Sequence, residues 1–368
     1  MKKILIGYVT DGRNSGIDNY IINVIGQIKD NNVKIDCLTN YIDPEMKTRL
    51  ADLGAGIIQI PTLKHPFAHY STTRDIIKRG QYDIAYFNIS EAFNCLGLLA
   101  AYKCGVDKVV VHSHSSGVNS HSEMVRFIRT FCHKVMKHLV VGKVATDYYT
   151  CSYVAGEWMF PKKVLQSSKF HIMNNAVKVD KFKFDENIRR KKRIELEIED
   201  RIVIGQTGSF SYQKNSEYIV DIAEALQKKE PRVLTIMIGT GDDFETVQNI
   251  VKERQLEDAV WLLGSRKDVG ELLQAMDFFI LPSRFEGLPI AAVEAQVSGL
   301  KTILSDTISR ETALTDRCMF LSIKEPAKKW ADKILDNINY DRKNIDLSEC
   351  TYCFDIDQQN LMIKKIFE

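Results

Sequence analysis

The stretch RIVIGQTGSF, residues 201–210, opens the second half of the chain with a run of β-branched residues that ends in a glycine turn. Such a run is typical of a strand that is buried on both faces and whose carboxyl end leads into a loop. Helical stretches separate it from further runs of the same kind, which are VLTIMIGTG, AVWLLG, DFFILPS and KTILS. Strands that alternate with helices predict a parallel sheet with helices on both faces.

The first half of the chain repeats this alternation. Its strand-like runs are KILIGYVT, VKIDCL, GIIQIP, YDIAYFNI and KVVVHSH. A charged segment that is poor in large apolar residues, VKVDKFKFDENIRRKKRIELEIEDR, separates the two series and indicates a linker. We therefore predict an α/β protein of two doubly wound, Rossmann-like domains, residues 1–177 and 178–350. In such folds ligands bind outside the carboxyl ends of the strands, so we expect the site in a cleft between the domains.

The composition is that of a soluble globular protein, with 368 residues of which 45% are hydrophobic and 27% charged. A net charge of +2 gives no reason to expect a nucleic-acid partner. No apolar run approaches the roughly 20 residues of a membrane span, and the start MKKILIGYVTDG fits a first strand better than a signal peptide. Eight scattered cysteines, including the lone pair Cys350 and Cys353, fit a reduced, cytoplasmic compartment.

Two glutamates in PSRFEGLPIAAVEAQVSG, residues 282–299, bear on function. Glu286 directly follows a strand, and Glu294 comes eight positions later inside a helix for which Pro289 suits the first position. The amides of residues 287–290 would then form a positive helix end suited to phosphate. One interpretation is a helix whose acids complement its positive end. The other is a site where two carboxylates accept hydroxyl groups of a sugar nucleotide.

Other strand ends of the second series also carry residues suited to a nucleotide. GQTGSFSYQKN places Lys214 six residues after Gly208, and lysine offers a point charge to a diphosphate. IGTGDD is a second glycine turn, and LLGSR ends another strand with a loop that could flank the base. We interpret Asp242 and Asp243 as a helix start and not as a metal clamp. Four strand ends of this chemistry in one domain favour the nucleotide site.

Taken together, these motifs resemble retaining glycosyltransferase family 4, whose members have the GT-B fold of two Rossmann-like domains facing each other across a cleft. The resemblance is carried by the spacing of Glu286 and Glu294, by Lys214 in QKN, and by VVVHSHSS, MNNAVKVDKF and SDTISRE. It covers most of the chain and is strongest to the capsular and exopolysaccharide branch. The tail FDIDQQNLMIKKIF, within residues 351–368, resembles the last helix of the family, which crosses back and packs on the N-terminal, acceptor-binding domain.

The resemblance implies a role for each matching residue. Glu294 would hold the donor ribose, Glu286 would contact hydroxyls of the transferred sugar, and Lys214 would neutralise the leaving diphosphate. Gly16, in the turn RNSGIDN, would turn its amide to the distal phosphate, and His114 would lie near the reacting centre. The implied catalytic residues are His114, Lys214 and Glu286. The implied donor-binding residues, with Arg266 bordering the base, are Gly16, Ser209, Lys214, Arg266, Glu286, Gly287, Leu288, Pro289, Ile290 and Glu294.

One position departs from the family. Members usually carry arginine directly after the glycine that Gly208 matches, where it forms a basic pair with the lysine, but this chain has Ser209. A serine can donate a hydrogen bond to a phosphate but cannot offset its charge. Either another cation substitutes, with Arg13, Arg266 and Arg310 as candidates, or turnover is slow or lost.

The resemblance also implies a mechanism. The sugar would be transferred with retention of anomeric configuration, the leaving phosphate would take the acceptor's proton, and no metal or other cofactor would be required. We expect a hexose or N-acetylhexosamine to pass from a UDP-sugar to a saccharide acceptor, carried on polyprenyl diphosphate, in cell-surface polysaccharide biosynthesis. Two alternatives stay open. One is a sugar-nucleotide epimerase, which would act without acceptor. The other is a non-catalytic accessory subunit, which the replacement of the usual arginine by Ser209 would explain.

Two histidines and two basic segments of the sequence also carry predictions. His112 and His114 alternate at a strand end, and we expect them to point to opposite faces, with His112 in the core or behind the site.

The run RRKKR at 189–193 predicts a solvated helix face or linker, with a contact to lipid as the alternative. Residues 123–143 predict an amphipathic helix that packs its apolar stripe on the N-terminal sheet and exposes a basic face, which could meet anionic lipid headgroups. The apolar stripe comprises Phe127, Ile128, Phe131, Val135, Met136 and Leu139.

Overall fold

The computed structural model describes residues 1–9, 16–30, 32–343 and 345–368, without the side chains of residues 349, 351 and 353. The chain divides into two compact units. Unit 1 comprises Met1–Val118, Ser122–Asn175 and Asp357–Glu368, and unit 2 comprises Asn119–His121 and Ala176–Ile356. This division differs from the expected bounds, because residues 119–121 belong to unit 2 and the tail is divided after residue 356.

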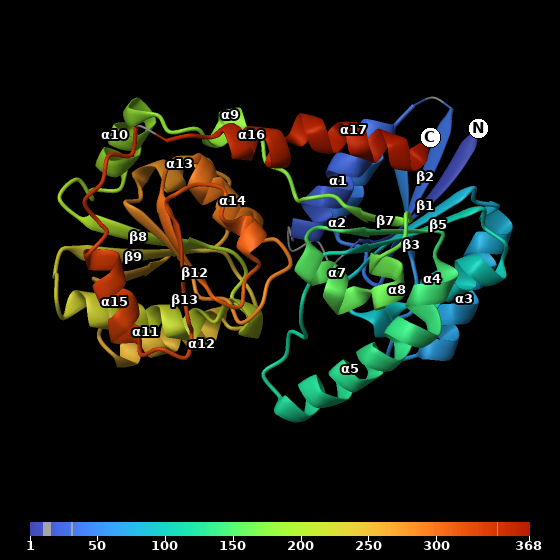
Figure 1. Ribbon diagram of the computed structural model, residues 1–368, viewed down its shortest axis with the longest axis horizontal. Helices are drawn as coiled ribbons and strands as arrows, with labels where there is room; N and C mark the ends of the chain where they lie inside the picture. The colour runs from blue at the N-terminus through green and yellow to red at the C-terminus, as the bar shows by residue number, and fades with distance from the viewer. Residues whose placement is uncertain (10–15, 31, 344) are drawn as a thin grey trace. The chain divides into compact units, whose positions relative to one another are not determined.

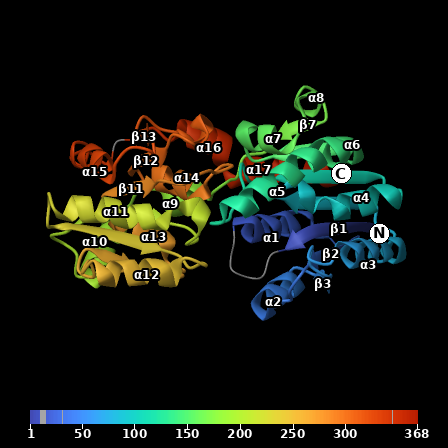
Figure 2. The same cartoon turned by 90° about the horizontal axis from the view of Figure 1, so that it is seen from below.

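Among its described residues, unit 1 contains a seven-stranded parallel sheet with the order β3-β2-β1-β4-β5-β6-β7. The strands are β1 (Lys2–Val9), β2 (Val33–Thr39), β3 (Ala55–Gln59), β4 (Ile84–Ile89), β5 (Lys108–Ser113), β6 (Asp147–Thr150) and β7 (Phe170–Ile172). The first five coincide with the predicted apolar runs. Sequence analysis missed β6 and β7 because their sequences, DYYT and FHI, are short and mix polar with aromatic residues. Figure 2 shows the edge strand β3 beside the helix α2 (Pro44–Asp52).

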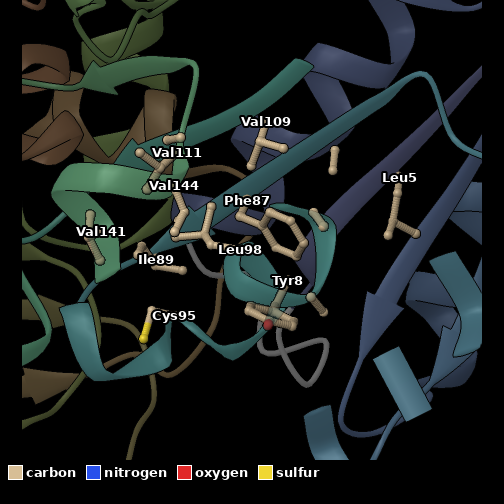
Figure 3. Packing of buried hydrophobic residues seen from close by; sticks show 14 of the residues in the cluster. Leu5, Tyr8, Phe87, Ile89, Cys95, Leu98, Val109, Val111, Val141 and Val144 are labelled. Atoms are coloured by element: carbon tan, nitrogen blue, oxygen red, sulfur yellow. The ribbon is translucent and has the colours of Figure 1, made fainter. Parts of the chain in front are cut away.

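Helices cover both faces of the unit-1 sheet (Figure 1). They are α1 (Gly16–Ile28), α2, α3 (Pro66–Gly80), α4 (Leu96–Lys103), α5 (Glu123–Met136), α6 (Gly142–Val144), α7 (Tyr153–Met159), α8 (Lys162–Leu165) and α17 (Ile356–Phe367), with the 3-10 turn η1 (Ala92–Asn94) and the π-helical segment η2 (Lys137–Val141). On one face Phe87 and Val111 of the sheet pack against Leu98 of α4 and against Val141 and Val144, which follow α5 (Figure 3).

The C-terminal helix α17 packs on the other face of the unit-1 sheet. Its residues Ile363, Ile366 and Phe367 are buried in the same cluster as the residues of β1 and α1. The rings of Phe367 and Tyr86 lie 5.4 Å apart, and the Lys2 ammonium donates a hydrogen bond of 2.6 Å to the Phe367 carbonyl. The expected single tail helix is in fact two, because the extended backbone at residue 355 ends α16 (Ser348–Phe354) in unit 2 before α17 begins.

Within the described part of unit 2, six parallel strands form a sheet with the order β10-β9-β8-β11-β12-β13. The strands are β8 (Ile202–Thr207), β9 (Val233–Ile238), β10 (Val260–Leu262), β11 (Phe278–Leu281), β12 (Lys301–Ser305) and β13 (Cys318–Leu321). The remaining elements are α9 (Val179–Phe182), α10 (Glu186–Glu195), η3 (Tyr212–Lys214), α11 (Ser216–Gln227), α12 (Phe244–Glu253), α13 (Val269–Ala275), α14 (Ile290–Val297), η4 (Arg310–Thr312), α15 (Ala327–Leu335) and α16. Of these six strands, only β13, CMFL, was not anticipated.

The charged segment expected to be a linker forms α9 and α10 of unit 2. Three of the five basic residues at 189–193 are bound to the body of the unit, so the predicted solvated face is wrong for them. The buried Lys192 ammonium lies 3.0 Å from an Asp268 carboxylate oxygen. Arg193 donates a hydrogen bond of 2.8 Å to the Ala275 carbonyl and pairs with Asp277, which also pairs with Arg189.

The helix predicted over 123–143 exists, and Met136 of its apolar stripe packs on the unit-1 core, but most of the stripe does not face the sheet. The helix comprises α5, η2 and α6, and its apolar residues Phe127, Ile128 and Phe131 are exposed to solvent instead of facing the sheet. The polar side of α5 faces the protein, as the buried His133 shows. No helix in the described part of the chain is long and apolar enough to span a membrane.

Candidate donor-binding site

The candidate site of unit 2 lies where its strand order reverses. From β8 the chain proceeds to β9 and β10 on one side, and β11 returns to the other side of β8. The loops that follow β8 and β11 are therefore neighbours at the carboxyl edge of the sheet, which is the usual place for a ligand in such folds. Two hydrogen bonds join them, from the Arg284 amide to the Gln213 carbonyl at 2.8 Å and from the Asn215 side chain to the Pro282 carbonyl at 3.1 Å.

Lys214 and Glu286 meet between these two loops. The ammonium of Lys214 donates to one carboxylate oxygen of Glu286 at 2.6 Å, and both side chains are largely buried. The Ser283 hydroxyl donates to the same oxygen at 2.7 Å, and the Gln213 amide donates to the other oxygen at 2.8 Å. Sequence analysis named both charged residues but gave no role to Gln213 or Ser283, although both stand in the quoted motifs QKN and PSRFEGLPIAAVEAQVSG. The structure thus holds Glu286 in a fixed orientation beside the lysine.

Glycines allow the strand-end loops to approach one another. Gly208 has a φ of 144° and Gly239 a φ of 139°, a backbone conformation that other residues rarely adopt. A Cβ atom on Gly239 would lie 2.0 Å from the carbonyl oxygen of Gly208. One on Gly208 would lie 3.1 Å from Cε of Lys214. The two glycine turns are therefore required for the close packing that positions the lysine.

The helix α14 begins one residue later than we predicted. Ile290 is its first residue, and Pro289 is the N-cap, whose side chain offers no hydrogen bond to the helix amides. The first turn of α14 contains no acidic residue. A helix start without a side-chain cap or an acid retains its positive end for an anion. Gly287 and Leu288, which precede it, are buried beside Glu286 in the same loop.

Glu294 lies in the second turn of α14, and its environment is unusual for a carboxyl group. Burial raises the pKa of Glu294 to about 7, and the positive charge of Lys181 in α9 opposes this only in part. Its carboxylate has no hydrogen-bond partner among the residues that the structure describes. A largely desolvated acceptor without a protein partner is suited to the paired hydroxyl groups of a ribose.

The comparisons with known proteins agree with this geometry. The family model described as glycosyl transferases group 1 matches residues 187–349, which include both loops and α14. This match confirms the resemblance to glycosyltransferases for residues 187–349 of the chain. It is 26% identical over 343 residues to the putative glycosyltransferase EpsF of Bacillus subtilis, covering 90% of this chain and 87% of that protein. It is 25% identical over 276 residues to an Escherichia coli UDP-Gal:alpha-D-GlcNAc-diphosphoundecaprenol alpha-1,3-galactosyltransferase, covering 73% and 68%.

Solved structures show the same fold. Anabaena HepE in complex with UDP-glucose superimposes with a TM-score of 0.76 at 17% identity, over 99% of this chain and 98% of that one. WaaG, a glycosyltransferase involved in lipopolysaccharide biosynthesis, superimposes with a TM-score of 0.70 at 13% identity, over 99% and 94%. The two parallel sheets and the returning C-terminal helix confirm the predicted GT-B fold, and the chain is a glycosyltransferase as predicted.

At the position after Gly208, where the resemblance implies a basic partner for the lysine, the chain has Ser209. Ser209 is exposed, and its hydroxyl lies 3.4 Å from that of Ser211. Two of the candidate substitutes are engaged elsewhere: Arg266 makes two hydrogen bonds to Asp268, and Arg310 lies over the Phe320 ring. The third, Arg13, lies outside the described residues.

Arg284, which sequence analysis did not consider, is the arginine that the structure places beside the Lys214 loop. Its guanidinium donates to the Tyr212 carbonyl at 2.6 Å and lies 4.4 Å from the centre of the Tyr212 ring. Its backbone amide is bonded to Gln213, directly before Lys214. The loop between β11 and α14 therefore contributes both a negatively charged and a positively charged side chain to this edge of the sheet.

The aspartates expected to begin a helix do so. Asp243 is the N-cap of α12, and both of its carboxylate oxygens lie within 2.9 Å of Nε2 of His121, to which sequence analysis gave no role. Among the described residues, no group of three or more His, Cys, Asp or Glu side chains could hold a metal ion.

The histidines of unit 1 differ from our expectation. His112 and His114 stack with ring centres 4.2 Å apart, so the prediction of opposite faces is wrong: residues two apart on a strand share a face. His114 bonds to the Asn88 side chain at 2.9 Å, and burial lowers its pKa to about 3, which keeps the ring neutral. Gly16 is the first residue of α1, and residues 13–15 of its turn lie outside the described part of the chain.

Proposed function

We propose that the chain transfers a hexose or N-acetylhexosamine from a UDP-sugar to a lipid-linked saccharide, with retention of anomeric configuration, in the assembly of a cell-surface polysaccharide. The named activities of the relatives support this proposal. One acts on UDP-Gal and a diphosphoundecaprenol-linked sugar, one is named in O-antigen biosynthesis, and a structural neighbour has been crystallised with UDP-glucose. We further propose that the protein works in the cytoplasm, where nucleotide sugars are available.

The observation that carries the proposal is the pairing of Lys214 with Glu286 at the reversal point of the unit-2 sheet. We propose that the diphosphate lies between Lys214 and the uncapped start of α14, with the ribose on Glu294 and the transferred sugar on Glu286. Lysine has three N–H donors, so Lys214 can keep its bond to Glu286 and still donate to a phosphate oxygen. One residue would then orient the sugar and stabilise the leaving group together.

In the proposed reaction the bond from the anomeric carbon to the β-phosphate oxygen breaks, and the acceptor oxygen bonds to the same face of that carbon. The acceptor's proton passes to the leaving phosphate, so no side chain has to act as nucleophile. Charge that develops on the diphosphate is met by Lys214 and by the α14 amides, which act in place of a metal ion. The neutral His114 would serve as a hydrogen-bond partner of the sugar and not as an acid.

We infer that Arg284 offsets the charge that Ser209 cannot. Its backbone amide bonds to Gln213 and its guanidinium to the Tyr212 carbonyl, both just before Lys214 in the chain, which supports a role for its charge at the proposed diphosphate site. A guanidinium stays protonated at every working pH and is suited to phosphate. The family's basic pair would thus be preserved with its arginine supplied by the neighbouring strand end.

The test is nucleotide release from a panel of UDP-, GDP- and ADP-sugars by the purified full chain, with and without a membrane lipid extract. We expect release of UDP that rises with the extract and that is lost in Lys214→Ala and Glu286→Gln, whereas Glu253→Gln, an exposed position on α12, keeps full activity. A UDP-sugar that raises the melting temperature without turnover would favour an accessory subunit. Interconversion of the donor sugar without acceptor would favour an epimerase.

A further inference from the structure

An apolar stripe on α5 lies on the surface of unit 1. The side chains of the stripe are largely exposed to solvent: Met124 by 68%, Phe127 by 72%, Ile128 by 51% and Phe131 by 63%. Their spacing of three and four residues places them on one face of the helix. Leu139 of η2 is 59% exposed in the same segment. Soluble surfaces seldom expose so many large apolar side chains together, and such patches usually mark an interaction site.

The opposite side of α5 is fixed to the protein by polar contacts, so the stripe cannot turn inward without breaking them. Arg129 forms a salt bridge with the buried Glu91. His133 stacks on the ring of Trp158 at 3.8 Å, accepts a hydrogen bond from the Ala92 amide at 2.9 Å, and lies 2.8 Å from the Trp158 carbonyl.

The segment that follows α5 is anchored as well. Val141 and Val144 are buried in the unit-1 core, where they face Leu98 (Figure 3). The Lys137 ammonium donates to the Glu157 carbonyl at 2.5 Å. Figure 1 shows the N-terminal part of α5 projecting from the body of unit 1. The apolar stripe is therefore a permanent surface of the folded unit.

The charged residues around the stripe indicate which kind of surface it binds. Residues 123–143 contain five Lys and Arg residues and one acid, Glu123. Arg129 and Lys137 contact the protein, whereas Lys134 and Lys143 are exposed, as are the lysines at 162 and 163. A second copy of the chain would bring the same basic charges against this face and be repelled. An anionic bilayer offers both hydrocarbon for the stripe and negative headgroups for the flanking cations.

We propose that α5 and η2 lie in the interface of an anionic lipid bilayer, with the stripe of Met124, Phe127, Ile128, Phe131 and Leu139 in the acyl boundary and Lys134 and Lys143 among the phosphates. This is the reverse of the basic-face contact considered from the sequence, because the apolar side of the helix is the one that inserts. The proposed lipid-linked acceptor would explain why the protein binds a bilayer, but the binding itself needs neither donor nor acceptor. Its failure and that of the proposed transfer are thus separable.

The test is co-sedimentation of the full chain with vesicles of phosphatidylcholine alone or of equal parts phosphatidylcholine and phosphatidylglycerol. We expect binding to the anionic vesicles, weakened by salt, and a decrease in the partition coefficient of at least about tenfold in the double variant Phe127→Ser/Phe131→Ser. Phe67→Ser is the matched control, because Phe67 is 90% exposed on α3 of the same unit and should bind as the unsubstituted chain does. Unchanged circular dichroism of the variants would show that folding is intact.

Two results would overturn the proposal. One is equal binding of the double variant and the unsubstituted chain, or no binding of either to the anionic vesicles. The other is a dimer in vesicle-free solution, seen by light scattering, that the double variant converts to a monomer, since the stripe would then contact a second copy. Release of UDP from a donor in detergent, with a soluble acceptor, reports on the transfer reaction independently of either result.

Discussion

Replacing Glu294 by glutamine should make the protein more stable above neutral pH while it weakens donor binding. The pKa of this buried carboxyl is raised to about 7, from an ordinary value of 4.5. The folded chain therefore holds a proton that the unfolded chain releases between these two values, and stability falls as pH rises through this range. A difference of 2.5 pH units at 1.36 kcal/mol each gives a cost of about 3 kcal/mol, fully present above pH 7 and absent below pH 4.

Glutamine at position 294 carries no charge and removes this cost. Urea unfolding of the full chain, followed by fluorescence at pH 5 and pH 8, should show Glu294→Gln more stable than the unsubstituted protein by up to about 3 kcal/mol at pH 8 and by much less at pH 5. Glu253→Gln on α12 is the control, since that side chain is exposed and its replacement should change neither value. An equal difference between the two proteins at both pH values would refute the reasoning.

The same residue should control how donor affinity depends on pH. The ionised carboxylate accepts two hydroxyl groups of the ribose, and a pKa near 7 means that only part of the population is ionised at pH 6. We expect UDP to bind more tightly as pH rises from 6 to 8, and to bind Glu294→Gln weakly with little change over this range. Titration calorimetry measures both. A variant that binds UDP as the unsubstituted chain does would remove Glu294 from the ribose site.

Three further predictions concern the loops around Lys214. Lys214→Ala should lower kcat by about 10²–10³, because it removes a charge that acts on the leaving group, and single-turnover kinetics with a fluorescent acceptor would measure it. Arg284→Gln should lower kcat by about tenfold, and adding Ser209→Arg should restore most of the loss; a variant of Arg284 with normal kcat would show that another cation serves the phosphate. Gly239→Ala should destabilise the fold by about 2 kcal/mol or more, because its φ is 139° and its Cβ would lie 2.0 Å from the Gly208 carbonyl; a melting temperature equal to that of the parent would contradict this.

Most of the architecture could be predicted because buried parallel strands are continuous apolar runs. The strands β1 and β9 could be predicted from composition alone, from the runs KILIGYVT and VLTIMIGTG. Sequence analysis missed DYYT and FHI because these strands are short and mix polar with aromatic residues, so they do not form continuous apolar runs. The start of α14 was misplaced by one residue because Pro289 suits the cap as well as the first turn.

The candidate site was only partly predictable, for reasons of geometry. Lys214 and Glu286 could be named from the chain, but their contact depends on the adjacency of β8 and β11, which no local pattern reveals. The hydrogen bonds of Gln213 and Ser283 to Glu286 depend on the same adjacency of the two loops. The packing of α5 could not be anticipated, since periodicity shows that a helix has two faces and not which of them the protein covers.

The Lys214–Glu286 pair also bears on how quickly the product leaves. Glu286 gives the lysine an internal counter-ion, so the protein itself balances this charge. UDP must share the ammonium with Glu286, and once the sugar has departed the carboxylate is a rival for that charge. In the proposed complex the carboxylate would therefore compete with bound UDP and limit product inhibition. A Glu286→Gln variant should retain UDP longer than the parent, even though it no longer orients the sugar.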